Sequence, residues 1–263
     1  MGKFYEVNNK SGSILLGADP IFIEGKDVGL LFIHGFTATP YEGKELSEWL
    51  NNYSGITVSV PLLPGHGTRP ADLKHISWID WYNYIKEKYF ELKRRCNRVF
   101  VCGQSMGGAL ALHLASHHPV EGIITLAAAV FLKDWRLKLF PLVRYVIPYH
   151  FKSKGPDIRK KSIKHLVPTY SRYPMRVIDQ LLSLLKHTRQ DLSDVTAPAL
   201  LIHSRKDRTV HFSNLQYIYD RISSEKKELL ILEKSYHVIS IDVEKEKVFQ
   251  VVNDFISKQV NRK

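Results

Sequence analysis

Cysteine is scarce in this chain, and no long apolar run occurs in it. The two cysteines, Cys96 and Cys102, stand six residues apart around one predicted strand, which holds them too far apart to form a disulfide. We therefore expect two reduced thiols, and a disulfide-stapled scaffold is excluded. No run of 18 apolar residues is present, so the sequence predicts no transmembrane helix.

Targeting signals are also missing from the amino terminus. Residues 1–6 lack the apolar stretch of a secretory signal peptide, and Glu6 stands where a myristoylation signal has serine or threonine. There are no internal repeats and no low-complexity segments. Together with the reduced cysteines, these absences predict a cytoplasmic protein.

The composition is that of a globular protein, with 263 residues of which 44% are apolar and 24% charged. Strand-like runs alternate with helical ones along most of the chain. Buried strands are predicted at 29–34, 56–61, 99–102, 122–126, 199–203 and 228–232. Helices are predicted at 40–50, 78–95, 106–116, 214–222 and 243–257. This alternation predicts an α/β fold with a mostly parallel central sheet flanked by helices.

Residues 131–190 interrupt the alternation. The first part of this segment is rich in proline, glycine and aromatic residues, and Pro174 then opens a helix with Met175, Ile178 and Leu181 on its apolar face. We interpret residues 131–190 as an inserted cap, or lid, over the carboxyl edge of the sheet. The core then consists of residues 1–130 and 191–263.

The net charge of +12 is concentrated in this predicted cap. Residues 131–190 contain fourteen Lys or Arg against three Asp, a net +11, whereas the rest of the chain has 24 basic and 23 acidic residues. A basic segment can bind nucleic acid, contact an anionic lipid surface, or simply form a solvated face. No nucleic-acid-binding motif accompanies the charge, so we expect no nucleic-acid partner. Peripheral contact with anionic lipid and a solvated face remain as alternatives.

The stretch that carries most chemical information is Gly103-Gln104-Ser105-Met106-Gly107. An apolar strand precedes it and an alanine- and leucine-rich helix follows it. Gly-x-Ser-x-Gly in a strand–turn–helix context is typical of a nucleophile elbow, in which the serine hydroxyl is exposed on a sharp turn. The alternative is that Ser105 is only a helix N-cap.

A serine nucleophile needs a base, and the base needs an acid to orient it. Asp207 follows the predicted strand at 199–203, and His237 follows the strand at 228–232, in the chain order Ser, Asp, His that the elbow architecture uses. Both lie just beyond strand carboxyl ends, where open α/β sheets gather their sites. Asp207 could instead be a solvated turn residue, with Asp134 as the second candidate acid, and His237 could be a structural loop histidine.

Acyl transfer also needs hydrogen-bond donors for the oxyanion. We expect the backbone N–H of Met106 to be one donor, because it begins the helix directly after the nucleophile. The other is expected from the loop His34-Gly35-Phe36-Thr37, most simply from the N–H of Phe36. Among the twelve histidines we find no His-Glu-x-x-His motif or comparable ligand spacing, and His117-His118 is typical of a helix C-terminus. We therefore expect no metal and no organic cofactor.

Several segments resemble the α/β-hydrolase superfamily and, within it, the bacterial carboxylesterase and monoacylglycerol lipase group. The resemblance runs from about Gly17 to the C-terminus. It rests on residues 17–20, 31–37, 64–68, 103–108 and 235–238, which read GADP, LFIHGFT, PGHGT, GQSMGG and SYHV. It implies an α/β-hydrolase fold with Ser105 as nucleophile, Asp207 as acid, His237 as base, and Phe36 and Met106 as oxyanion donors. The chain departs from the group at residues 160–174, where no counterpart of the carboxylate that contacts glycerol is found.

These observations predict a serine hydrolase acting on carboxyl esters. The apolar cap helix favours acyl groups of medium to long chain length, monoacylglycerols included, and the expected partner is a small-molecule ester. An acyltransferase or thioesterase could use the same triad, and differs in what resolves the acyl-enzyme. A non-catalytic binding module is the alternative from another class, but such modules usually lose a triad member and this chain retains all three.

Overall fold

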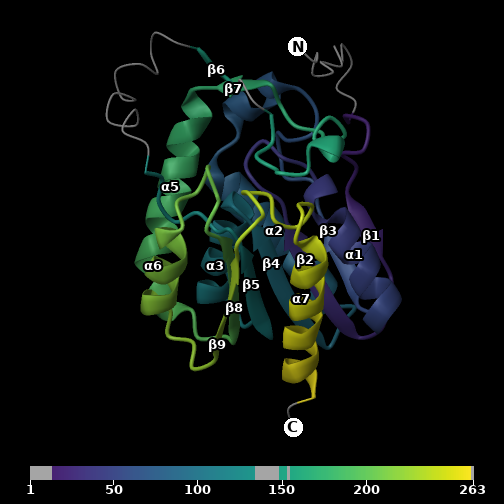
Figure 1. Cartoon of the computed structure of the whole chain (residues 1–263). Coiled ribbons are helices and arrows are strands. Elements are labelled where there is room, and N and C mark those ends of the chain that lie inside the picture. The colour runs from purple at the N-terminus through teal and green to yellow at the C-terminus, as the bar shows by residue number, and fades with distance from the viewer. Residues whose placement is uncertain (1–13, 134–147, 153–154, 262–263) are drawn as a thin grey trace.

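A computed structural model describes residues 14–133, 148–152 and 155–261 (Figure 1). Within these residues the chain forms a seven-stranded sheet with the strand order β1-β3-β2-β4-β5-β8-β9. Its strands are β1 (Ile21–Ile23), β2 (Val28–Ile33), β3 (Thr57–Val60), β4 (Arg98–Gln104), β5 (Gly122–Leu126), β8 (Ala199–Ser204) and β9 (Lys227–Leu232). All pairs are parallel except β1 with β3. The predicted mostly parallel sheet is thereby confirmed.

Helices cover both faces of this sheet (Figure 1). They are α1 (Tyr41–Ser54), α2 (Trp78–Lys93), α3 (Met106–His117), α5 (Arg176–Asp191), α6 (Ser213–Arg221) and α7 (Lys245–Val260). In the part of the chain that the structure describes, no helix is both long and apolar enough to cross a bilayer.

The core is divided into two layers by the alternation of side chains along the buried strands. In β4, Val99 and Val101 face the cluster that contains α2, α3, α5 and α6 residues, whereas Phe100 and Cys102 face the cluster with α1 and α7 residues. Cys96 and Cys102 are both buried and unbridged, as expected. Because both faces are covered, the strands read as continuous apolar runs rather than as alternating ones.

The region between β5 and β8 differs in detail from the sequence prediction. A second, two-stranded antiparallel sheet pairs β6 (Tyr149–Phe151) with β7 (Arg172–Pro174), and the sequence analysis did not predict it. Pro174 ends β7 and does not open the helix, which begins at Arg176. A proline at the end of an edge strand is tolerated because its missing N–H costs no ladder bond.

Helix α5 packs into the main core and not on a separate one. Val177, Leu181, Leu184 and Leu185 belong to the same buried cluster as the apolar residues of α2 and α3. Met175, directly before this helix, and Ile178 form a small cluster with Tyr173 and Leu182. The helix α5, most of which lies in the predicted cap, is therefore packed on the side of the sheet that α2 and α3 cover.

Candidate active site

Ser105 lies at the turn between β4 and α3, in a backbone conformation that non-glycine residues rarely adopt. Its φ is 57° and its ψ is −116°, which costs about 1–3 kcal/mol. The turn is this tight because α3 passes close over the ends of β2 and β4. A Cβ at Gly107 would lie 2.0 Å from the carbonyl oxygen of Ile33, and one at Gly103 would lie 2.1 Å from that of Gly107. Both motif glycines are thus required sterically.

His237 joins Ser105 to Asp207 in one chain of hydrogen bonds. Its Nδ1 lies 2.7 Å from Asp207 Oδ2, and its Nε2 lies 2.8 Å from Ser105 Oγ. An ionised carboxylate can only accept hydrogen bonds, so Nδ1 carries the ring proton and donates a hydrogen bond to Asp207. The lone pair of Nε2 therefore faces the serine hydroxyl, as a general base requires. The three predicted triad residues come together although 132 positions of the sequence separate Ser105 from His237.

Asp207 is held ionised by its surroundings. Its Oδ1 accepts the backbone N–H groups of Thr209 and Val210, each at 2.8 Å, while its Oδ2 lies 3.2 Å from His203 Nε2. Burial opposes ionisation, but the charge of His237 and the hydrogen bonds from His203 and His237 outweigh it and hold the pKa of Asp207 well below its usual range. The solvated-turn alternative does not fit, since this carboxylate is buried.

The pKa of His237 moves in the opposite direction. Burial alone would lower it, but the negative charge of Asp207 and the hydrogen bond to Asp207 raise the pKa above its ordinary 6.5. A more distant contribution comes from Glu42. The imidazole thus gains basicity from Asp207, which is the direction of change that a general base would need.

Backbone contacts fix the loop that carries His237. The side-chain amide of Gln104, the residue before the nucleophile, donates to the carbonyl of His237 at 2.9 Å. The N–H of His237 donates in turn to the carbonyl of Asp157 at 3.0 Å. The buried carboxylate of Asp242 accepts the N–H groups of Arg159, Lys160 and Tyr236 at 2.7–3.0 Å. This loop is therefore bonded both to the elbow and to the predicted cap.

The two predicted oxyanion donors border Ser105. Met106 is the first residue of α3, where N–H groups have no partner inside the helix. Phe36 lies in the turn after β2, and an ideal Cβ on the adjacent Gly35 would be 3.4 Å from the Cβ of Ser105. The loop after β2 and the N-terminus of α3 therefore both lie close to Ser105.

A half-buried lysine and a buried glutamate near this loop were not anticipated from the sequence. The ammonium of Lys152 donates to Thr37 Oγ1 and, at 3.3 Å, to Thr169 Oγ1. Burial lowers the pKa of Lys152 to about 8 against the opposing charge of Glu42. Burial likewise raises the pKa of Glu42 to about 7, although the N–H of Gly35 donates to its Oε2 at 2.8 Å.

We call the turn after β2 that holds Phe36 and Thr37 the oxyanion loop. These contacts tie the predicted cap to it. Thr37 follows Phe36 and has a positive φ of 58°, and its carbonyl accepts the hydroxyl of Thr169 at 3.0 Å. The ring of Phe36 also packs edge-on against Tyr173, with 5.1 Å between centroids. No motif signals a buried lysine or glutamate in a sequence, because their identity depends on which distant residues fold against them.

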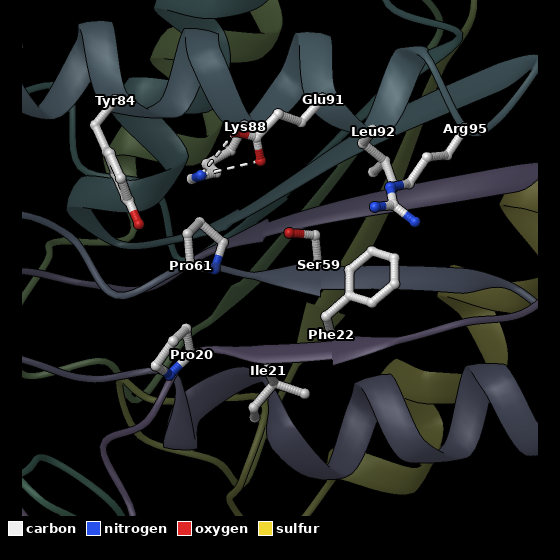
Figure 2. Close-up of a pocket in the computed structure, with 10 residues that line it drawn as sticks. All are labelled: Pro20, Ile21, Phe22, Ser59, Pro61, Tyr84, Lys88, Glu91, Leu92 and Arg95. Atoms are coloured by element: carbon white, nitrogen blue, oxygen red, sulfur yellow. Dashed lines mark hydrogen bonds and ion pairs between the residues drawn. The ribbon is translucent and has the colours of Figure 1, made fainter.

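A surface hollow elsewhere is not part of this site. It has a volume of about 350 Å³ and lies between the β1 edge of the sheet and α2, lined by Phe22, Ser59, Tyr84 and Arg95 among others (Figure 2). None of the residues named above as candidates lines it. The second candidate acid, Asp134, lies outside the described residues.

A mostly parallel sheet flanked by helices, with a serine at a strand–helix elbow and an acid and a histidine on later loops, is the architecture of the α/β-hydrolases, and the protein is one of them. More narrowly, residues 27–244 match the model of the Hydrolase_4 family, described as serine aminopeptidase, S33. The chain belongs to this family and is a hydrolase.

Curated relatives cover nearly the whole chain. A thermostable monoacylglycerol lipase of Bacillus sp. strain H-257 is 35% identical over 246 residues, which is 93% of this chain and 96% of the relative. A carboxylesterase of Bacillus subtilis strain 168 is 28% identical over 241 residues, 91% of this chain and 96% of the relative.

Solved structures agree with the fold. One from work on LipS and LipT, two metagenome-derived lipolytic enzymes, is 34% identical, covers 94% of this chain and 100% of its own, and superposes with a TM-score of 0.89. The monoacylglycerol lipase of Paleococcus ferrophilus, at 17% identity, covers 91% of this chain and 98% of its own with a TM-score of 0.77. The likeness to the Paleococcus ferrophilus structure concerns the fold alone.

Proposed function

We propose that this hydrolase cleaves carboxyl esters of medium- and long-chain acyl groups, monoacylglycerols among them, through Ser105, His237 and Asp207. The observation that carries the proposal is the unbroken hydrogen-bond chain from Asp207 Oδ2 to Ser105 Oγ, with 2.7 and 2.8 Å at its two links. The names of the two Bacillus relatives, a monoacylglycerol lipase and a carboxylesterase, support ester hydrolysis as the reaction class.

In the first half of the reaction, Ser105 Oγ attacks the ester carbonyl carbon while His237 Nε2 takes the hydroxyl proton. Asp207 stabilises the imidazolium that forms. The negative charge that develops on the carbonyl oxygen is bound by the backbone N–H groups of Phe36 and Met106. When the tetrahedral intermediate collapses, the C–O bond to the alcohol breaks and His237 returns its proton to the departing oxygen.

The second half repeats these steps with water as the nucleophile. Water attacks the acyl-enzyme carbonyl, His237 takes one of its protons, and the collapse of the second tetrahedral intermediate releases the fatty acid and restores the Ser105 hydroxyl. If an alcohol acceptor took the place of water the same triad would be an acyltransferase, and if the substrate were a thioester it would be a thioesterase.

The preference for longer acyl chains rests on the apolar surroundings of the oxyanion loop. The ring of Phe36 packs on Tyr173, and Tyr173 in turn joins the cluster of Met175 and Ile178 at the start of α5. Apolar surface of this kind favours alkyl chains by about 0.8 kcal/mol for each buried methylene. We propose that residues 131–190 form the cap over this region, and that their basic side chains contact anionic lipid surfaces.

A substrate panel tests the proposal. We expect kcat/KM to rise from acetate to medium- and long-chain p-nitrophenyl esters, with monoacylglycerols hydrolysed to free fatty acid and glycerol. Ser105→Ala should lower kcat by several orders of magnitude on every ester. A strong preference for acyl thioesters over matched esters, or transfer of the acyl group to added alcohol without fatty acid release, would assign the triad to one of the other two reactions.

A further inference from the structure

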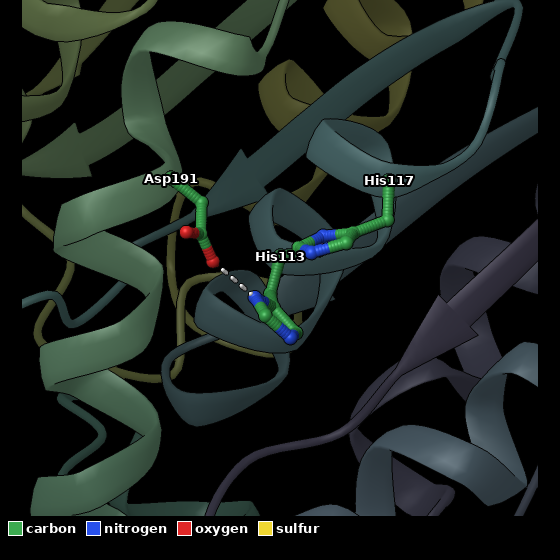
Figure 3. A group of neighbouring side chains, drawn as sticks. All are labelled: His113, His117 and Asp191. Atoms are coloured by element: carbon green, nitrogen blue, oxygen red, sulfur yellow. Dashed lines mark hydrogen bonds and ion pairs between the residues drawn. The ribbon is translucent and has the colours of Figure 1, made fainter.

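Two helices bring a histidine pair and a carboxylate together, away from the triad. His113 and His117 stand one turn apart on α3, with 4.5 Å between their ring centroids. Asp191, the last residue of α5, approaches them from the neighbouring helix, and its Oδ2 lies 2.7 Å from His113 Nδ1 (Figure 3). Each of the three residues offers a ligand atom within 4.8 Å of the other two.

The atoms that would hold an ion follow from the hydrogen bonds of the two imidazoles. His117 Nδ1 lies 2.9 Å from the carbonyl oxygen of His113. A carbonyl oxygen only accepts, so Nδ1 donates and the lone pair of His117 is on Nε2. A ligating histidine whose other nitrogen donates to a backbone carbonyl is a usual arrangement around protein-bound metals. His113 Nδ1 faces Asp191 Oδ2 directly, so a bound ion would take the place of the proton between these two atoms.

His113 is buried, and its ring lies against aromatic side chains of α2. His187 lies one turn before Asp191 on α5, and its ring stacks on Trp78, whose ring also contacts His113. The ring of Tyr82 packs on His113 from α2.

An ordinary ion pair between helices would need only His113 and Asp191. That reading leaves His117 as an exposed histidine at the C-terminus of α3 and does not use the position of its imidazole beside that of His113. The presence of a second imidazole at the spacing of one helical turn is the feature that distinguishes a ligand set from a salt bridge.

We propose that His113, His117 and Asp191 bind a divalent transition-metal ion of the zinc class, which joins the C-terminal end of α5 to α3. Two imidazoles and one carboxylate suit Zn²⁺, Co²⁺ or Ni²⁺, whereas Ca²⁺ and Mg²⁺ prefer oxygen ligands alone. From the rise of an α-helix, these histidines lie roughly 12–18 Å along α3 from Ser105. The ion therefore stabilises the contact between the helices and takes no part in ester cleavage.

The test uses untagged full-length protein made metal-free with EDTA. We expect added Zn²⁺ to raise the melting temperature, by about 5 °C or more once its concentration is a hundredfold above the dissociation constant. Co²⁺ added in its place should give the visible absorption bands of a protein-bound ion. Hydrolysis of a short-chain ester at 25 °C should be the same with and without EDTA.

Two variants locate the site. His117→Ala removes an exposed ligand and leaves the bond between His113 and Asp191 in place, so the variant should fold normally yet bind Zn²⁺ at least tenfold more weakly. His165→Ala, a matched change at an exposed histidine elsewhere in the chain, should bind as the unaltered protein does. Equal Zn²⁺ affinity in His117→Ala and the unaltered protein would overturn the proposal, as would the absence of saturable binding by the unaltered protein.

Discussion

At the scale of single residues, the chemistry of this protein depends on charges that burial would normally suppress. Asp207 stays ionised because two histidine side chains and two N–H groups face it. His237 gains a raised pKa from Asp207. Lys152 and Glu42, by contrast, are brought by burial to pKa values of about 8 and about 7. The site thus holds groups that change charge close to neutral pH.

The raised pKa of His237 predicts the acid side of the pH profile. Hydrolysis requires neutral His237, so kcat/KM should fall as the pH drops through the His237 pKa. Asp207→Asn removes the charge that raises this pKa, so the fall of kcat/KM at low pH, the acid limb of the profile, should move to lower pH. In the same variant kcat should fall by as much as about 10⁴-fold. The profile is measured on a soluble ester whose own chemistry does not change with pH. An acid limb that stays in place in Asp207→Asn would contradict the assignment of Asp207.

Lys152 is expected to act by positioning the oxyanion loop. Lys152→Met removes the hydrogen bonds to Thr37 and Thr169 beside Phe36, so kcat should fall about tenfold, equivalent to about 1.4 kcal/mol, with a smaller change in KM. Lys161→Met, at an exposed position of the same segment, is the control and should leave both constants unchanged. Partial rescue by Lys152→Arg would support hydrogen bonding. A change in KM alone would instead indicate that Lys152 takes part in substrate binding and does not position the oxyanion loop.

Residue roles could be predicted from the sequence where a motif or a chain order marks them. Ser105, Asp207 and His237 follow strands in a fixed order, and the structure brings all three together. Glu42 and Lys152 follow no such pattern, because only the folded packing buries them. The pair His113 and His117 does carry a sequence signal, a spacing of four on a predicted helix. A search for His-Glu-x-x-His does not find this pair, and whether it binds a metal ion is the proposal made above.

At the scale of elements, long buried strands and amphipathic helices were predictable and short exposed elements were not. The strand β5 was predicted at 122–126 as observed, and α2 ends within two residues of its predicted end. The three-residue strands β1, β6 and β7 were missed, since a hydrophobic period cannot be recognised over so few positions. They form through pairing with partners that are distant in the sequence.

The basic segment makes a prediction at this scale. If the predicted cap contacts anionic lipid, each nearby Lys or Arg contributes about 1 kcal/mol. Reversing Arg159, Lys160 and Lys161 to glutamate should weaken co-sedimentation with anionic vesicles, most clearly at low salt. The backbone N–H groups of Arg159 and Lys160 still reach Asp242 in that variant, so hydrolysis of a short-chain ester should be unchanged.

The control for this experiment reverses three exposed lysines outside the segment, namely Lys44, Lys93 and Lys247. It makes the same change in net charge and should weaken vesicle binding less. Equal binding of the unaltered protein to neutral and anionic vesicles, or no binding to either, would identify the basic segment as a solvated face.

At the scale of the whole molecule, one sheet positions every candidate catalytic group. The loops after β2, β4, β8 and β9 carry Phe36, Ser105, Asp207 and His237, and all these strands run parallel, so their carboxyl ends lie at one edge. Three residues of the predicted cap contact the loops at that edge: Thr169 bonds to Thr37, Tyr173 packs on Phe36, and the carbonyl of Asp157 accepts the N–H of His237. The fold class followed from the sequence because this alternation of strands and helices extends over most of the chain.

The central claim is that Ser105 is a covalent nucleophile activated by His237. It is tested most directly by reacting the protein with a fluorophosphonate probe, in which an activated serine oxygen displaces fluoride from phosphorus, and mapping the labelled peptide. The account predicts a single label on Ser105, lost in Ser105→Ala and strongly slowed in His237→Ala. Labelling of another residue, or normal ester turnover by Ser105→Ala, would contradict it.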